Sequence, residues 1–423
     1  MAHAKTDERK RVHILIRSNM ENSTDLAIKM DGGKPNQVNL IAQGAYGCIF
    51  YPGISCDSGK VDGPNFVTKI QKNERTTMNE ISISNKIKQI KGYTRYFAPI
   101  VKQCPVKLTS QTTSEMKKCD VFKQETLDPK QTFVSNKIRY VGKKNMRRHL
   151  LDKYVSQYAS YGSNPHKPPI KASATEKHAH AFFSELLRTQ IYLNRGIEHL
   201  INAKIVHNDI RYNNMVFDDK LEVPIFIDFG LSIDMRELSP ETYTKRFYVF
   251  DIYPYWSMDV HICNYIFQVV TYPRAKTERI RTSDIAPLIN SFIYKENAKE
   301  KGTFNIGNEV FNLAIIQDQI NGFKTKWTNY LKKFVNKTWF ELYESCIRYF
   351  DTWDAYSVCV VYMMVMDDIF SKNTELYNVL YKSHGSALVE YIQIVSSVIY
   401  ETSDKRPNLA KLNYTLKNIQ KMM

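Results

Sequence analysis

Two short stretches decide the fold of this chain: Ile205-Val206-His207-Asn208-Asp209-Ile210-Arg211-Tyr212-Asn213-Asn214 and Pro224-Ile225-Phe226-Ile227-Asp228-Phe229-Gly230. The first reads as a short strand, then a polar loop that leads back into a strand. The second reads as a buried apolar strand that ends in a carboxylate, with a glycine that lets the chain turn. Both stretches therefore place polar side chains on short loops at the ends of apolar strands.

The side chains on these loops suit phosphoryl transfer, which needs phosphates held, a metal fixed and an acceptor hydroxyl positioned. We expect Asp209 to accept or orient the acceptor proton. Asn214 and Asp228 supply the amide and carboxylate oxygens that Mg²⁺ prefers, and Mn²⁺ suits the same ligands. Arg211 can contact the γ-phosphate as charge develops there.

An N-terminal hairpin adds a candidate phosphate-binding loop, Gly44-Ala45-Tyr46-Gly47-Cys48-Ile49. Glycines let backbone amides approach a phosphate, although paired glycines are also common in ordinary hairpin turns. Lys69 lies in the next predicted strand, residues 66–70, and could bind the α- and β-phosphates. The order of glycines and then lysine favours the phosphate-binding interpretation.

Together these motifs resemble the eukaryotic protein kinases, and most of all the divergent serine/threonine kinases of large DNA viruses. The similarity runs from about residue 38 to about residue 420, interrupted by insertions. It implies an α+β fold with a small β-rich N-lobe and a larger, mainly helical C-lobe. It also implies transfer of the γ-phosphate of ATP to protein serine or threonine, with tyrosine left open because Arg211 also occurs at this place in some tyrosine kinases.

The resemblance assigns further residues. Glu80 would be the helix partner of Lys69. The residues that would bind adenine are Ile49, Val67, Tyr140, Val141 and Val216. Three residues would be structural: Asp354 begins a buried helix, and Arg406 pairs with Asp259 at the end of the activation segment.

The sequence departs from the family pattern inside its best motif. Asn208 replaces the arginine that usually precedes the catalytic aspartate and receives an activation-segment phosphate. This replacement predicts activity that is not controlled by such a phosphate. His207 is expected to pack and hydrogen-bond rather than react.

The predicted organisation has three parts. Residues 1–37 form a polar extension, 38–141 the N-lobe with an insertion near 103–132, and 142–423 the C-lobe with an insertion near 262–345. Residues 180–202 have the apolar spacing of a long amphipathic helix.

Composition limits the partners and the compartment. The formal net charge of +16 favours anionic partners and leaves nucleic acid open, although basic surfaces are often only solvating. Seven cysteines without a C-x-x-C pair predict neither a disulfide framework nor a zinc site, and hence a reducing compartment. We expect a soluble protein of the cytoplasm, the host-cell cytoplasm or virion if the source is viral. The apolar run 356–366 is too short to cross a bilayer.

Two other functions are compatible with part of this set of residues. Small-molecule phosphotransferases of the aminoglycoside-kinase type share the His-x-Asp motif, but they lack a full Asp-Phe-Gly and the late Arg406-Pro407 counterpart. A pseudokinase scaffold, binding protein or nucleic acid, usually lacks one of the reacting residues. Lys69, Asp209, Asn214 and Asp228 are all present here, which favours the protein kinase.

Overall fold

The structure, a computed structural model, divides the chain into two compact units. Unit 1 comprises Met1–Asn145 and Val216–Ser232, and unit 2 comprises Met146–Met215 and Ile233–Met423. The described residues are 38–44, 47–56, 63–106, 118–120, 132–156, 175–247, 253–293 and 314–423. The predicted lobe boundary at 141–142 lies slightly before this division, and Val216–Ser232, expected in the second lobe, groups with unit 1.

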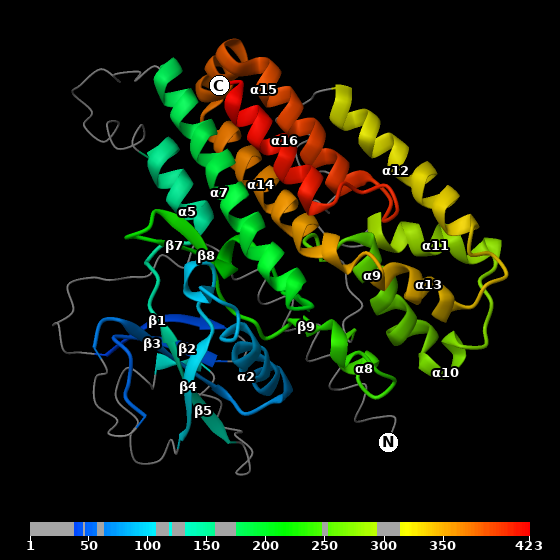
Figure 1. The fold of residues 1–423 in the computed structure, drawn as a ribbon, viewed down its shortest axis with the longest axis horizontal. Coiled ribbons are helices and arrows are strands. Elements are labelled where there is room, and N and C mark those ends of the chain that lie inside the picture. Colours follow the sequence, from blue (N-terminus) through cyan, green and yellow to red (C-terminus); the bar gives the residue numbers. More distant parts are fainter. Residues whose placement is uncertain are drawn as a thin grey trace. The chain divides into compact units, whose positions relative to one another are not determined.

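Unit 1 is built on a five-stranded antiparallel sheet in the order β1-β2-β3-β5-β4 (Figure 1). The strands are β1 (Asn39–Gly44), β2 (Gly47–Tyr51), β3 (Phe66–Lys72), β4 (Ile100–Val106) and β5 (Phe133–Arg139). The strand predicted at 66–70 is confirmed within β3. One helix, α2 (Arg75–Ile87), follows β3 and directs Glu80, Ile83 and Ile87 inward.

The strand register assigns side chains to the two faces of the sheet. One cross-strand row consists of Ile49, Lys69, Asn136 and Gln103. The adjacent row consists of Cys48, Ile70, Ser135 and Cys104. Because successive side chains in a strand point to opposite faces, these two rows lie on opposite faces of the sheet.

Two disulfides, Cys48–Cys119 and Cys56–Cys104, cross-link unit 1. The prediction that the cysteines form no disulfides is therefore wrong, and with it the basis for a reducing compartment. The paired cysteines are 71 and 48 residues apart, and strand pairing brings them together. Cysteine number and local spacing carry no information about such long-range pairing.

The insertion predicted at 103–132 begins later than expected, because β4 continues to Val106. Within it the structure describes Cys119 and its two neighbours, and Cys119 packs in a small apolar cluster with Phe50, Ile70 and Phe133. Residues 1–37, 107–117 and 121–131, together with the loop residues Ala45 and Tyr46, lie outside the described residues.

A segment far along the chain completes unit 1. It contains β7 (Met215–Asp218), whose residues from Val216 onward belong to this unit, and β8 (Val223–Phe226). The amide of Phe217 donates to the carbonyl of Lys144 at 2.8 Å, and the amide of Ala98 donates to the carbonyl of Phe226 at 3.0 Å. These bonds hold the residues before Asp228 in the same unit as Lys69.

Unit 2 is mainly helical. Its principal helices are α5 (Met146–Leu151), α7 (Glu176–Asn202), α8 (Tyr243–Arg246), α9 (Met258–Tyr265), α10 (Tyr272–Ala275), α11 (Thr282–Ile293), α12 (Ala314–Lys332), α13 (Trp339–Ile347), α14 (Trp353–Lys372), α15 (Thr374–Tyr400) and α16 (Leu409–Lys421). The helix expected at 180–202 is confirmed within α7, which begins earlier because Thr175 caps it. Two short strands, β6 (Ile205–Val206) and β9 (Ile233–Asp234), pair beside the first motif.

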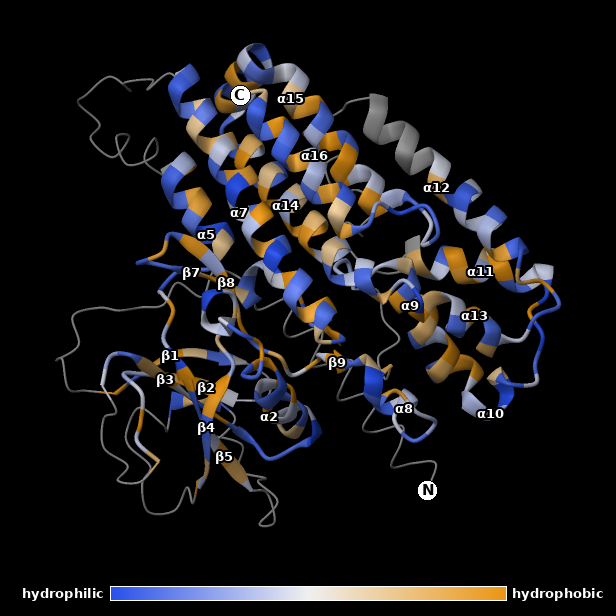
Figure 2. Cartoon of the chain, in the orientation of Figure 1, coloured by the Kyte–Doolittle hydropathy of each residue, from blue (hydrophilic) through white to orange (hydrophobic). Residues whose placement is uncertain are grey.

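Helices α7, α14, α15 and α16 lie side by side in unit 2 (Figure 1). Helix α14 is hydrophobic along most of its length, and most of its side chains are buried (Figure 2). The apolar run at 356–366 is therefore a core segment of this helix. Among the described residues, no helix has the length and apolar content that crossing a bilayer requires.

The region 262–345, predicted as an insertion, contributes part of α9 and α10 to α13 in its described parts. Its tryptophans, Trp327 and Trp339, are buried. The three cysteines of unit 2, Cys263, Cys346 and Cys359, are buried with free thiols. The region packs on the rest of unit 2, since α12 lies against α15 and the ring of Tyr343 in α13 lies 5.9 Å from that of Phe247. Residues 294–313 lie outside the described residues.

Candidate functional site

A buried ion-pair cluster joins three predicted site residues in unit 1. Lys69 Nζ lies 2.9 Å from Glu80 Oε2 and 3.2 Å from Asp228 Oδ1. The side chain of Glu80 is 4% exposed, whereas that of Asp228 is 37% exposed. The predicted pairing of Lys69 with Glu80 is present, and Asp228 is the more accessible of the two carboxylates.

The electrostatics of this cluster keep the lysine charged. Burial alone would lower the pKa of Lys69, but the carboxylates of Asp228 and Glu80 outweigh burial and raise it. Gln71 donates a further hydrogen bond of 3.2 Å to Glu80 Oε2, so the buried carboxylate has two donors. Lys69 is therefore a fixed cation with one carboxylate behind it and another that is partly open to solvent.

The loop that carries Asp228 is held in an unusual conformation. Asp228 has a φ of 62°, in the left-handed region that non-glycine residues seldom adopt. Asn79 Nδ2 donates to the carbonyls of Gly230 and Ser232, both at 2.9 Å. Such strain persists only where surrounding contacts impose it, and it concentrates at functional sites. Asn79 was missed from the sequence, where its place next to Glu80 on α2 was the one available signal.

Gly47 is required by close packing. A β-carbon at Gly47 would collide with the carbonyl oxygen of Ile70 in β3. The strand register pairs Gly44 with Gly47 across the hairpin, and Ile49 with Lys69. The hairpin therefore approaches β3 closely at the strand position next to Lys69. Nothing in this contact depends on a phosphate.

The predicted adenine-binding residues all belong to unit 1. Val67 and Lys69 are two residues apart on β3, so their side chains lie on the same face of the sheet. Ile49 of β2, which pairs with Lys69, lies on that face too. Gly142 lies against the carbonyl of Phe217 with no room for a β-carbon, and Asn145 forms a bridge to Val216. These contacts place β7 beside the segment that follows Tyr140 and Val141. Burial raises the pKa of Tyr140, and its ring lies 4.4 Å from that of Tyr51.

A second cluster, in unit 2, surrounds Asp209. Asn214 Nδ2 donates to both the backbone carbonyl and Oδ2 of Asp209, each at 2.8 Å. Arg211 Nε lies 3.9 Å from Asp209 Oδ1. The two bonds from its amide nitrogen fix the orientation of the Asn214 side chain, so its amide oxygen is the atom that could bind a metal.

Tyr253 was not among the predicted site residues, yet it contacts Asp209 directly. Its hydroxyl donates to Asp209 Oδ1 at 2.6 Å. Burial and the nearby carboxylate raise the pKa of Tyr253, which keeps the phenol protonated as a donor. The ring packs at 5.1 Å from Tyr255 and 4.9 Å from Trp256. This aromatic run therefore supplies a polar contact to Asp209 as well as packing.

The loop before Asp209 is anchored by Asp354. Its carboxylate accepts from the amides of His207 at 2.7 Å and Asn208 at 3.0 Å. Asn208 has a φ of 60°, and asparagine tolerates this conformation better than most residues. Trp256 Nε1 donates to the carbonyl of Asn208 at 2.8 Å. The structural role expected of Asp354 matches these contacts, and backbone conformation gives a reason for Asn208.

A deeply buried ion pair supports the same unit. Arg406 Nη1 lies 2.8 Å from Asp259 Oδ2, with both side chains almost completely buried. Arg406 also donates to Thr352 Oγ1 at 2.9 Å. The pairing of Arg406 with Asp259 expected from the sequence is present. It joins the beginning of α9 to the residues before α14 and α16.

No family model matches the chain, and no curated protein matches its sequence. Within the described residues, no three His, Cys, Asp or Glu side chains gather as a metal site. In unit 1 the cation of Lys69 lies between two carboxylates. In unit 2 the carboxylate of Asp209 accepts hydrogen bonds from the amide of Asn214 and the phenol of Tyr253.

Proposed function

We propose that this chain is an ATP-dependent protein kinase with a two-lobed kinase-like fold, in which unit 1 is the N-lobe and unit 2 the C-lobe. The observation that carries this proposal is the contact of Lys69 with both Glu80 and Asp228. The three residues come from separate motifs, because Glu80 and Asp228 are 11 and 159 residues away from Lys69 along the chain. A protein kinase requires this lysine to be oriented by one acid while another acid serves the metal.

Unit 1 would bind the nucleotide. Ile49, Val67 and Val216 offer apolar surface for a purine, and the charged Lys69 would hold the α- and β-phosphates. Asp228 is partly exposed and carries a carboxylate oxygen of the kind that Mg²⁺ prefers. In unit 2, the amide oxygen of Asn214 is also of the kind that Mg²⁺ can bind. Bound Mg²⁺ would neutralise phosphate charge.

Unit 2 would handle the acceptor. Asp209 would orient the acceptor hydroxyl and receive its proton, while Asn214 fixes the carboxylate through Oδ2. Arg211 is near enough to Asp209 to contact the γ-phosphate as charge develops. The hydroxyl of Tyr253 now makes the hydrogen bond that an acceptor hydroxyl would make with Oδ1. We therefore propose that a protein acceptor, with serine or threonine as the primary class, replaces Tyr253 at this oxygen.

The test is a phosphorylation assay with Mg²⁺·ATP on a mixed protein panel, followed by phosphosite mapping. We expect Asp209→Asn to lower the rate by about 10²–10⁴-fold, because it removes the proton acceptor. Lys69→Met should also lower the rate, because it removes the cation that would hold the α- and β-phosphates of ATP. Glu198→Gln, which removes an exposed carboxylate of α7, is the matched control and should keep full activity.

The same assay separates the rival functions. Phosphorylation of a sugar or choline with no protein labelled would contradict the protein kinase and favour a small-molecule phosphotransferase. Nucleotide binding with no transfer by the wild type would indicate a pseudokinase. Equal labelling by wild type and Asp209→Asn would show that Asp209 is not the reacting residue.

A further inference from the structure

The two disulfides of unit 1 differ in their access to solvent. Cys48 and Cys119 are both 0% exposed and lie in the apolar cluster behind β2 and β3. Cys56 and Cys104 are both partly exposed. Exposed disulfides are the ones that exchange with external thiols, because the attacking thiolate must reach a sulfur atom in line with the bond. The two bonds should therefore differ in how readily they are reduced.

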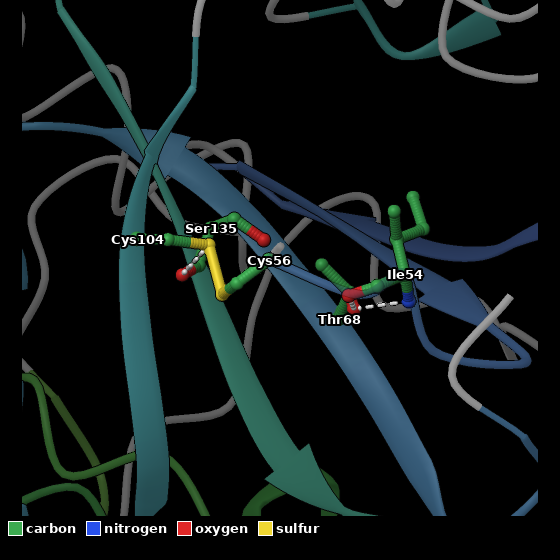
Figure 3. The surroundings of a disulfide bond; sticks show 5 residues. All are labelled: Ile54, Cys56, Thr68, Cys104 and Ser135. Carbon is green, nitrogen blue, oxygen red and sulfur yellow. Dashed lines mark hydrogen bonds between the residues drawn. A yellow bond between two sulfur atoms is a disulfide. The ribbon is translucent and has the colours of Figure 1, made fainter. Parts of the chain in front are cut away.

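The loop that carries Cys56 is held near the sheet by contacts other than the disulfide. The amide of Ile54 donates to Thr68 Oγ1 at 2.7 Å, and that hydroxyl donates back to the carbonyl of Ile54 at 3.3 Å (Figure 3). The amide of Gly53 donates to the carbonyl of Phe66 at 2.8 Å. Opening the disulfide leaves these bonds intact, so the Cys56 thiol stays within reach of its partner.

The other half of the bond also has a place for a reduced sulfur. Cys104 Sγ lies 3.7 Å from the carbonyl oxygen of Ser135 on the neighbouring strand. Figure 3 marks this contact with a dashed line. A disulfide sulfur carries no hydrogen, whereas a thiol is a weak donor. The reduced Cys104 could therefore donate to Ser135. Both halves of the opened bond keep a defined position, which is what a reversible reaction requires.

From these contacts we propose that Cys56–Cys104 is a site of reversible thiol–disulfide exchange, with a dithiol as co-substrate, and that Cys48–Cys119 is not. A thiolate of the dithiol attacks one sulfur, forms a mixed disulfide and releases the other cysteine as a thiolate, which takes up a proton. The second thiol of the reagent then closes its own disulfide and releases the remaining cysteine. The pair gains two electrons and two protons, and the dithiol loses them.

The exchange has a consequence for the sheet that carries Lys69. The bond connects the loop after β2 to β4, and β3 and β5 lie between those two strands. Cys104 belongs to the cross-strand row next to that of Lys69, on the opposite face. Opening the bond leaves these strands connected by their own hydrogen-bond ladders. Reduction removes the covalent restraint between the loop after β2 and β4, so the sheet that carries Lys69 becomes less rigid. We therefore expect nucleotide binding to weaken about threefold to tenfold on reduction, an expectation that rests on the proposed function.

The first test is a titration of the full native chain with dithiothreitol, followed by alkylation and mass mapping of every cysteine. We expect Cys56 and Cys104 to be alkylated together in the folded protein, and Cys48 and Cys119 only after denaturation. Reoxidation should restore the same pair. Reduction of both disulfides at the same dithiol concentration, or of neither before unfolding, would overturn the assignment of an exchange site.

The second test measures binding of a fluorescent ATP analogue with Mg²⁺ to the oxidised and the reduced wild type. The variant with Cys56→Ser and Cys104→Ser should bind like the reduced protein and should not respond to the dithiol. Equal affinity of both wild-type forms would overturn the link to the nucleotide. If neither form binds the analogue while the exchange stays selective, the proposed function fails and the exchange site stands.

Discussion

The two units of this molecule reach stability by different means. The described part of unit 1 is built on a five-stranded sheet and the 13-residue helix α2, and two disulfides cross-link it. Unit 2 is a set of long helices around a large apolar core, and its three cysteines are buried and unpaired. A small domain buries a smaller fraction of its surface than a large one, so covalent bonds contribute relatively more to its stability. The difference indicates that oxidation state acts mainly on unit 1.

The candidate reacting groups differ between the units in the same way. In unit 1 a charged lysine is fixed by two carboxylates in an ion-pair cluster. In unit 2 the carboxylate of Asp209 is fixed largely by neutral donors, an amide and a phenol. An ion pair holds a cation suited to phosphates, whereas neutral donors leave a carboxylate its negative charge. The first arrangement suits binding and the second suits proton transfer.

This contrast can be measured because the units have separate reporters. All four tryptophans, Trp256, Trp327, Trp339 and Trp353, belong to unit 2. Tryptophan fluorescence therefore follows unfolding of unit 2 alone. Hydrogen exchange of the β3 amides follows unit 1, since strand amides in a sheet exchange only when the sheet opens.

The largest expected effect is on unit 2. Arg406→Met removes the partner of the buried Asp259 and should destabilise unit 2 by about 3–5 kcal/mol, because it leaves a buried charge unpaired. Denaturant unfolding followed by tryptophan fluorescence measures this loss. Lys333→Met breaks the exposed pair with Asp404 and is the control, with a loss below about 1 kcal/mol. Equal losses in both variants would contradict the role given to burial.

The second effect is on unit 1. Cys48→Ser together with Cys119→Ser should destabilise unit 1 by about 2–4 kcal/mol, because the bond closes a long loop in the unfolded chain. Exchange of the β3 amides should quicken while the tryptophan transition stays in place. Cys263→Ala is the control with the opposite pattern, since that thiol is buried in unit 2. A shift of the tryptophan transition in the disulfide variant would show that the two units do not unfold separately.

The sequence predicted the local parts of the candidate site and missed those that depend on long-range packing. The strand with Lys69, the loop with Asp209 and the strand before Asp228 follow from apolar runs that end in polar residues. Nothing local to Cys48 indicates Cys119, because the sheet must form before the two sulfurs meet. Tyr253 likewise contacts Asp209 only through the fold, 44 residues along the chain.

Fold class was predictable to a similar extent. The resemblance of the motifs implied a β-rich N-terminal part and a mainly helical remainder, and the structure has both. The helices within 262–345 were not predicted individually, because basic residues interrupt their apolar spacing. In the structure, the buried side chains of Trp327 and Trp339 show which face of α12 and of α13 points inward. That face could not be identified from the sequence, because lysines are frequent in this region.

The third effect tests unit 2 through pH. Burial lowers the pKa of His261 to about 3, so the ring is neutral in the folded state, with Ser291 Oγ 3.0 Å from its Nε2. The unfolded histidine takes up a proton below about pH 6.5. The contribution of the neutral His261 ring to the free energy of unfolding is therefore complete above that pH. It is lost as the pH falls from 6.5 towards 3, by up to about 1.4 kcal/mol per pH unit.

His261→Gln should flatten this part of the stability curve. Between pH 6.5 and 5 the wild type should lose about 2 kcal/mol more than the variant, as measured by tryptophan fluorescence in denaturant. At pH 8 the two curves should differ only by the packing cost of the substitution. Parallel curves over the acid range would show that His261 is protonated in the folded protein.

The smallest expected effect concerns the hydrogen bond between Tyr253 and Asp209 in unit 2. The proposal is that the hydroxyl of the phosphate acceptor replaces the Tyr253 hydroxyl at Asp209 Oδ1. Tyr253→Phe keeps the ring beside Tyr255 and Trp256 and removes the hydrogen bond to Oδ1. If the phenol competes with the acceptor, the specificity constant kcat/KM for a protein substrate should rise about threefold to tenfold, the equivalent of about 1 kcal/mol. The KM for ATP should not change, because no nucleotide contact is assigned to Tyr253.

Tyr255→Phe is the control, since its ring packs in the same run with no hydroxyl contact to Asp209 among the described hydrogen bonds. A fall in kcat with an unchanged KM would instead make Tyr253 a positioning residue that orients the carboxylate.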